Sequence, residues 1–151
     1  MTKSNCVANL CQSNVVTVAG NATIKDAAGV MRKHHVGSLV VTNGKPARIA
    51  GILTDRDIAI VAVARDFDPL TLRVEQVMTG KVHTVSSEST PSHALQIMRK
   101  HGVRRLPVTD EHGYLAGILT LDDLLDSFAG QLDSVVHAMQ REREHEEQVR
   151  V

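Results

Sequence analysis

The sequence is built from two copies of one unit, and this duplication constrains the fold more than any other feature. Residues 15–18 (Val-Val-Thr-Val) return 67 residues later as Val-His-Thr-Val at 82–85. After a one-residue contraction, residues 50–54 (Ala-Gly-Ile-Leu-Thr) return letter for letter at 116–120. Matches this dense, in one register with a single gap, predict two tandem repeats that share a core, because one copy alone is small for an independent domain.

Each repeat has the residue pattern of a strand, a helix, two strands and a closing helix. Thr23 and Thr90 precede helical apolar spacing and are expected N-caps, and Pro91 suits a first helical turn. We predict an α/β (α+β) fold with two β-α-β-β-α repeats packed with pseudo-two-fold symmetry, two equivalent clefts and a C-terminal helix. The expected strands are 15–18, 38–41 and 49–53 in the first copy and 82–85, 105–108 and 114–119 in the second, with closing helices from near Asp55 and Leu121.

A polar segment with a proline separates the copies and predicts a linker. The predicted units are 1–66 (first repeat with the N-terminal segment), 67–73 (linker), 74–128 (second repeat) and 129–151 (C-terminal charged helix or tail). Apolar residues at helical spacing in the last unit predict a helix whose first part packs and whose last turns are solvated. A frayed tail is the alternative. These apolar residues are Leu132, Val135, Val136 and Met139.

Composition argues against several classes of function. The 17 basic and 17 acidic residues give a net charge of zero and aromatic residues make up 2%, which disfavours nucleic-acid binding. No apolar run approaches the ~20 residues of a membrane span and no signal-peptide core is present, so we expect a cytoplasmic protein without membrane contact. Cys6 and Cys11 match no zinc spacing, and no His pair has an acidic partner at metal-site spacing, so no metal is expected. Cys11 aligns with Met78 and should fill an apolar slot.

The strongest site signal is a Thr-x-x-Asp frame that follows the third expected strand of each repeat. Thr54 and Asp57 in the first copy correspond to Thr120 and Asp123 in the second, while the residues between them differ. A helix begins there, so free N–H groups and the helix dipole are expected to form an anion-binding mouth. The carboxylate can accept two hydrogen bonds from a ribose diol. The alternative is that Thr and Asp only cap their helices, but the retention of the frame in both copies favours a ligand.

From Val7 to about Asp126 the chain resembles a tandem pair of CBS domains, also called a Bateman module. The resemblance rests on the Val-x-Thr-Val motifs, the Met-Arg-Lys-His helix ends, the Arg-Arg-Leu-Pro-Val segment at 104–108 and the two Gly-Ile-Leu-Thr-x-x-Asp frames. It implies clefts for adenosine-containing ligands (AMP, ADP, ATP, NAD or S-adenosylmethionine) as regulatory ligands, with no catalytic cofactor. The residues it assigns are Asp57 and Asp123 to the ribose, Thr54 and Thr120 to the phosphate, and Val36 and Val103 to the adenine, near the start of the preceding strand.

The two copies differ beside the predicted site. Arg104 and Arg105 stand where the first copy has a glycine and Ser38. Arginine forks suit phosphate oxygens, and clefts of the family often recruit basic groups from the opposite repeat. We therefore predict that the first-copy cleft faces both arginines and is the better phosphate site. Arg56 would assist, whereas Asp122 at the matching position would repel phosphate. Solvated surface arginines are the alternative.

These features favour a regulatory protein over an enzyme. The sequence has no nucleophile with a base, no Gly-rich phosphate loop and no metal-binding motif of a protease. Bound nucleotide would stabilise one arrangement of the repeats, in proportion to its differential affinity for the two states. Because no catalytic or transport domain accompanies the repeats, we expect a protein partner in trans and a flat homodimer of the family's kind, to which the tail helix contributes. The alternative function is a dimeric adaptor that binds no nucleotide.

Overall fold

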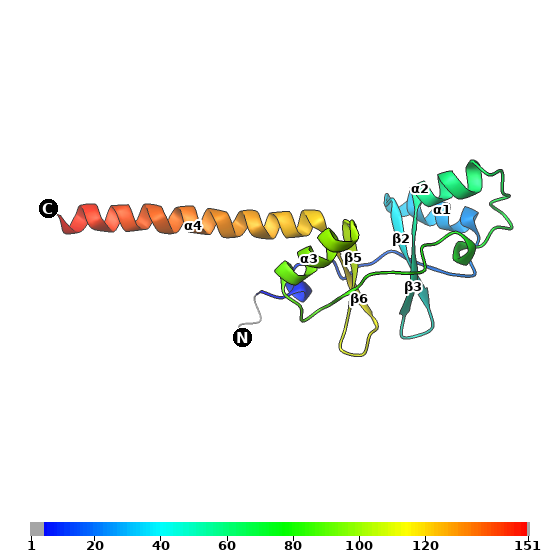
Figure 1. The fold of residues 1–151 in the computed structure, drawn as a ribbon, viewed down its shortest axis with the longest axis horizontal. Helices are drawn as coiled ribbons and strands as arrows, with labels where there is room; N and C mark the ends of the chain where they lie inside the picture. Colours follow the sequence, from blue (N-terminus) through cyan, green and yellow to red (C-terminus); the bar gives the residue numbers. More distant parts are fainter. Residues whose placement is uncertain (1–4, 151) are drawn as a thin grey trace.

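The computed structural model describes residues 5–150, so residues 1–4 and 151 of the predicted end segments lie outside the described part. Two three-stranded sheets lie side by side, one per repeat, with both hairpins pointing the same way (Figure 1). In each sheet the first strand pairs parallel with the second, and the second pairs antiparallel with the third. The strands are β1 (Thr17–Ala19), β2 (Ser38–Asn43) and β3 (Arg48–Thr54), then β4 (Val85–Ser86), β5 (Arg105–Thr109) and β6 (Leu115–Thr120).

The predicted helices are confirmed together with their caps. Thr23 Oγ1 accepts a 3.1 Å hydrogen bond from the Asp26 N–H, and Thr90 Oγ1 accepts one of 3.2 Å from the His93 N–H. Pro91 is the first residue of its helix, where its missing N–H costs nothing. The helices are α1 (Ile24–His34), α2 (Asp55–Asp57) continuing as η2 (Ile58–Val63), α3 (Pro91–His101) and α4 (Leu121–Val149), with short 3-10 turns η1 (Val7–Asn9) and η3 (Val74–Gln76).

The first strand of each repeat begins later than the sequence predicts. Val15 and Val16 precede β1, and Val82 and His83 precede β4. These residues are half-buried and line the clefts described below, although the Val16 carbonyl oxygen still accepts the Val40 N–H of β2 at 3.2 Å. The valines at three of these four positions therefore reflect contact with a cleft as well as pairing in a sheet.

Short segments are exchanged between the repeats. Val7, from the N-terminal segment, is fully buried in the core of the second repeat, and Val74 is fully buried in the core of the first. Gln12 forms an antiparallel bridge with Ile118 of β6, and Thr79 forms the matching bridge with Ile52 of β3. Each sheet is thus extended by a residue that precedes the other repeat in the chain. The predicted boundaries at residues 66 and 74 stay predictions; the packing runs across them.

Two glycines make the exchange possible. A Cβ on Gly117 would lie 2.8 Å from Cys11 Sγ and 2.9 Å from the Gln12 carbonyl oxygen. A Cβ on Gly51 would lie 2.5 Å from Met78 Sδ and 2.9 Å from the Thr79 carbonyl oxygen. Cys11 and Met78 therefore occupy equivalent packed slots, as their alignment suggests, and burial raises the pKa of the Cys11 thiol.

The C-terminal helix differs from the prediction. α4 continues without a break from the second repeat and extends away from both sheets (Figure 1). Leu124 is fully buried and Phe128 is half-buried, but every residue from 129 to 150 is exposed. The expectation that the first part of this apolar stripe packs is wrong within this chain, because α4 leaves the core after two turns. Leu132, for example, is 68% exposed.

Candidate functional site: two clefts between the repeats

The Thr-x-x-Asp frames form the same capping box in both repeats. Thr54 Oγ1 accepts a 3.1 Å hydrogen bond from the Asp57 N–H, and Asp57 Oδ2 accepts one of 2.9 Å from the Thr54 N–H. Thr120 and Asp123 make the same two bonds at the same distances. The capping role considered from the sequence is therefore present. It uses one oxygen of each carboxylate, and a carboxylate has acceptor capacity for further donors.

The expected anion-binding mouth at the start of α2 is not open. The Asp55 N–H donates to the Gly37 carbonyl oxygen at 2.9 Å, and the Arg56 N–H donates to Asp55 Oδ1 at 2.8 Å. The Asp57 N–H is held by Thr54. All three N–H groups of the first turn are therefore used within the protein, and a phosphate at this place must be recognised mainly by side chains.

The first cleft, named the Thr54 cleft, contains Thr54 and Asp57 from the first repeat. Its volume is about 190 Å³. The opposite wall comes from the second repeat and the segment before it, including Val103 and the basic residues Lys81 and His83. Its lining residues are Ile52, Thr54, Asp57, Thr79, Lys81, Val82, His83, Val103 and Arg105.

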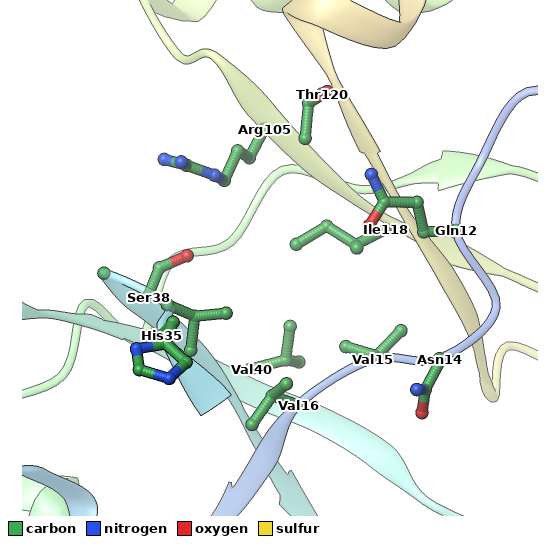
Figure 2. Close-up of a pocket in the computed structure, with 12 residues that line it drawn as sticks. Gln12, Asn14, Val15, Val16, His35, Ser38, Val40, Arg105, Ile118 and Thr120 are labelled. Atoms are coloured by element: carbon green, nitrogen blue, oxygen red, sulfur yellow. The ribbon is translucent and has the colours of Figure 1, made fainter. Parts of the chain in front are cut away.

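The second cleft, named the Thr120 cleft, has a volume of about 280 Å³. Figure 2 shows Arg105 and Thr120 on one side and the valines Val15, Val16 and Val40 on the other. The cleft therefore has a polar wall from the second repeat and an aliphatic wall from the first. Its lining residues are Gln12, Asn14, Val15, Val16, His35, Val36, Gly37, Ser38, Val40, Arg105, Ile118 and Thr120.

The clefts are crossed between the repeats. The sequence places Val36 and Val103 ahead of the strands that precede the threonine of their own repeat, whereas each valine shares a cleft with the threonine of the other repeat. Ser38 lines the Thr120 cleft although it pairs with Thr54 in the sheet. The crossing follows from the pseudo-two-fold packing and is not visible in either copy alone.

The predicted arginines separate into two groups. Arg105 lines both clefts, as the residue paired with Thr120 across β5 and β6. Arg104 and Arg56 are exposed and belong to neither set of lining residues. The Arg104 carbonyl oxygen accepts the Leu121 N–H at 2.8 Å, which fixes the strand end rather than a ligand. Asp123 is bonded to Thr120 but, unlike Asp57, is not among the lining residues of its cleft.

Two basic residues of the Thr54 cleft were missed by the sequence analysis. Lys81 and His83 stand 67 residues after Asn14 and Val16, which line the Thr120 cleft at the equivalent places. Following the repeat offset into the segment before the first strand would have revealed this change from neutral to basic. The Thr54 cleft therefore has three basic side chains, Lys81, His83 and Arg105, where the Thr120 cleft has Arg105 and His35. It also contains the carboxylate of Asp57, so its extra lysine is balanced unless the ligand's ribose engages Asp57.

His83 also stacks on His101, with ring centroids 3.5 Å apart and ring planes 13° apart. Partial desolvation in the stack, followed by repulsion from His83, Lys100 and Lys81, lowers the pKa of His101. The end of α3 is thereby joined to the wall of the Thr54 cleft. An anion bound in this cleft would oppose that repulsion and favour protonation.

Within residues 5–150, no three His, Cys, Asp or Glu side chains gather closely enough to hold a metal ion. In the same part of the chain, no helix combines the length and the apolar character needed to cross a membrane.

Comparison with known proteins decides the family. The sequence profile described as CBS domain matches residues 7–63 and again residues 74–130. The chain belongs to the CBS-domain family. Both CBS matches begin at the exchanged segments, so each includes the residues that complete the other repeat's sheet.

Several known proteins are similar over most of this chain. A 17.7 kDa protein of Acidianus ambivalens is 39% identical over 134 residues, covering 89% of this chain and 76% of that protein. Hypoxic response protein 1 of Mycobacterium tuberculosis is 34% identical over 116 residues, covering 77% and 80%. Against a protein of Methanopyrus kandleri, 34% identical, the match spans 82% of this chain and 62% of that protein's length.

Several solved structures share the fold. Hypoxic Response Protein I, crystallised with two coordinated zinc ions, has a TM-score of 0.72 at 31% identity and covers 80% of this chain and 97% of that chain. The CBS domain pair of protein MJ0100, in complex with 5-methylthioadenosine and S-adenosyl-L-methionine, has a TM-score of 0.72 at 27% identity, covering 83% and 97%. The cytosolic domain of the Mg²⁺ channel MgtE, in complex with ATP, also scores 0.72 at 27% identity, covering 83% and 49%.

Proposed function

We propose that this CBS pair is a regulatory module that binds an adenosine-containing ligand. The observation that carries the proposal is the crossed pair of clefts. Each cleft joins the helix-capping threonine of one repeat to aliphatic side chains of the other. A ligand in such a cleft contacts both repeats at once. It therefore favours one relative arrangement of the repeats by its differential affinity for that arrangement.

The chemistry of the Thr54 cleft fits the parts of a nucleotide. Asp57 keeps one carboxylate oxygen outside the capping box and can accept hydrogen bonds from a ribose diol. Val82 and Val103 offer apolar contact to an adenine ring. Because the backbone N–H groups are already used, phosphate recognition falls to Lys81 and Arg105. ATP, the ligand in the MgtE structure, has all three parts, and S-adenosyl-L-methionine, a ligand in the MJ0100 structure, has the adenine and the ribose diol but no phosphate.

We assign the more highly phosphorylated ligand to the Thr54 cleft. It has Lys81 and His83 where the Thr120 cleft has Asn14 and Val16. Among the described residues that line the Thr120 cleft, Arg105 is the one lysine or arginine. This cleft therefore suits a ligand with less negative charge, such as AMP or S-adenosylmethionine. The preference predicted from the sequence is thus kept, but Lys81 and His83 replace Arg104 and Arg56 as its basis.

The test is isothermal titration with AMP, ATP, NAD and S-adenosylmethionine on the full chain and on single variants. Asp57→Asn keeps an acceptor for the Thr54 N–H while removing the charge, and Asp123→Asn does the same in the other cleft. Asp26→Asn is the matched control, because Asp26 is an exposed carboxylate in the first turn of α1. Saturable binding that Asp57→Asn weakens by tenfold or more, with Asp26→Asn unchanged, supports the proposal.

A second candidate, a dimeric adaptor that binds no nucleotide, is favoured by the capping boxes. Thr54, Asp57, Thr120 and Asp123 already have a structural role without any ligand. If none of the four ligands binds to the folded chain, this reading replaces the first.

We further propose that the signal passes to a separate protein in the cytoplasm and that the chain acts as a homodimer. Family resemblance supports both. The homodimer is the part for which the chain's own residues suggest an interface.

A further inference from the structure

The free half of α4 is a helix without tertiary support. Leu124 and Phe128 anchor its start in the core of the second repeat, yet all residues from 129 to 150 are exposed. An isolated helix of this length is marginal in water, since most helical stability in proteins comes from packing of an apolar face. The apolar face is present: Leu125, Leu132, Val135, Val136 and Met139 are each between 51% and 68% exposed.

The spacing of this face is that of a coiled coil. Leu125, Phe128, Leu132, Val135 and Met139 follow one another at steps of three, four, three and four residues. This is the alternation of a and d positions in a heptad, with a period of about 3.5 residues. A shallow depression on the same helix lies among Val136, Met139, Gln140 and Arg143. Of these four residues only Met139 stands at one of the alternating positions, so the depression lies beside the stripe.

Charge decides the orientation if the second helix comes from another copy. The next two seam positions are Glu142 and Glu146. In a parallel pair, each glutamate would face its own equivalent across the seam, and like charges there are destabilising. In an antiparallel pair centred between Asp133 and Ser134, each Glu142 lies at the end of the seam, beside Leu125 of the other copy.

The antiparallel register also pairs complementary residues. Its central layers join Leu132 to Val135 of the second copy, and the part of the half-buried Phe128 that its own core leaves exposed to Met139 of the second copy. At the flanking positions, Arg143 lies beside Asp122 of the second copy, a pair that occurs twice by symmetry. The small side chains of Ala129 and Ala138 flank the central layers and allow the helices to approach.

We propose that α4 pairs with α4 of a second copy as an antiparallel coiled coil through Leu125, Phe128, Leu132, Val135 and Met139. This proposal deepens the homodimer part of the proposed function by naming the interface and its direction. It places the two CBS pairs at opposite ends of the paired helices, an arrangement that differs from the flat homodimer expected from the sequence. Their clefts stay complete within each chain, since all their lining residues come from one copy.

The mass test uses the full chain and size-exclusion chromatography with light scattering. The wild-type chain of 16.4 kDa should elute at about twice that mass. Leu132→Glu with Val135→Glu should elute as a monomer and lose helical signal in circular dichroism. The matched control, Ser134→Glu with Gln148→Glu, adds the same charge to α4 off the stripe and should remain dimeric. A monomeric wild type, or a dimer that survives the double change in the stripe, would overturn the proposal.

Orientation is measured by pulsed electron spin resonance on a single spin label at Gln148→Cys, with Cys6 and Cys11 replaced. In the antiparallel register the two labels are separated by 29 residues of helix, about 44 Å at about 1.5 Å per residue. In a parallel pair they would lie about 10 Å apart, the spacing of neighbouring helices. The short distance would refute the antiparallel arrangement even if a dimer forms.

Nucleotide titration of the monomeric variant keeps the two proposals separate. Because the clefts are intramolecular, ligand affinity should change less than threefold when the stripe is disrupted. Failure of nucleotide binding in every variant would count against the ligand and leave the dimer untouched.

Discussion

His83 and His101 lie face to face with ring centroids 3.5 Å apart, and only one of the two, His83, lines the Thr54 cleft. The stack joins two regions of the second repeat, the segment before β4 and the end of α3. It also places two titratable rings in a surrounding that already contains Lys81 and Lys100. Proton binding at this point is therefore coupled to the fold.

The first prediction concerns stability against pH. The lowered pKa of His101 means that the unfolded chain, in which this pKa returns to its ordinary value of 6.5, binds the proton more readily. The contribution of His101 to the free energy of unfolding should be fully present above pH 6.5 and should fall as the pH drops through the folded pKa. Urea unfolding at pH 7.5 and pH 5.5 measures it. His101→Gln should reduce the loss of stability between these pH values, and His93→Gln, exposed on the same helix, should not. An equal pH response in all three proteins would contradict the prediction.

The second prediction concerns the exchanged segments. Gly51→Ala should lower the free energy of unfolding by about 2 kcal/mol or more, because the new Cβ meets Met78 Sδ and the Thr79 carbonyl oxygen. Gly29→Ala is the control in α1 of the same repeat, where nothing lies within 4 Å of a Cβ. It should stabilise the protein by about 0.5–1 kcal/mol. Denaturant unfolding compares the two; a neutral Gly51→Ala would mean that the exchanged segment yields easily.

The third prediction separates capping from ligand binding. Thr120→Ala and Thr90→Ala each remove a side-chain cap, so each should lower the free energy of unfolding by about 1 kcal/mol. Only Thr120 lines a cleft, so only Thr120→Ala should also weaken nucleotide binding. Thermal unfolding and calorimetric titration of the same samples give both quantities. Equal affinities in the two variants would restrict Thr120 to a structural role.

The fourth prediction concerns charge in the clefts. Lys81→Ala should reduce ATP affinity at the Thr54 cleft by about tenfold or more, since a charge-assisted hydrogen bond contributes about 1.5–3 kcal/mol. Arg105→Ala should weaken both binding events, because Arg105 lines both clefts. Arg104→Ala should leave both unchanged. Two-site calorimetry distinguishes these patterns, and a large loss in Arg104→Ala would restore the arrangement expected from the sequence.

Much of the fold was predictable because the duplication presents the same order of strands and helices in two copies of the sequence. Thr23, Thr90 and Pro91 mark helix starts by chemistry that is local to a few residues, and the structure confirms them. The hidden part is tertiary. Val7 reads as an ordinary apolar residue of the first repeat, and only the packed structure shows that it lies in the core of the second.

For the candidate site, the Thr-x-x-Asp motifs were predictable from the sequence, whereas the basic residues that line the clefts were not. Thr54 and Asp57 stand out because the same spacing recurs at 120 and 123. The basic wall was not predicted because Lys81 stands just before the Val-His-Thr-Val motif and His83 occupies its variable second position, where the first copy has Val16. Arg104 lies just before β5, is exposed and lines neither cleft, a difference from its neighbour Arg105 that the sequence does not show.

The exchanged segments bear on how the chain is completed during synthesis. On a ribosome the first sheet, β1 to β3, emerges well before Val74 and Thr79, yet its core includes Val74 and its edge pairs with Thr79. The core and the sheet edge of the first repeat therefore cannot be completed until the residues that precede the second repeat have been made. For the second repeat the order is reversed. Val7 and Gln12 are synthesised first and reach their places in the second core and beside β6 only after β6 has been made. Neither repeat can complete its packing before residues of the other segment have been made, so the two repeats are expected to complete folding together.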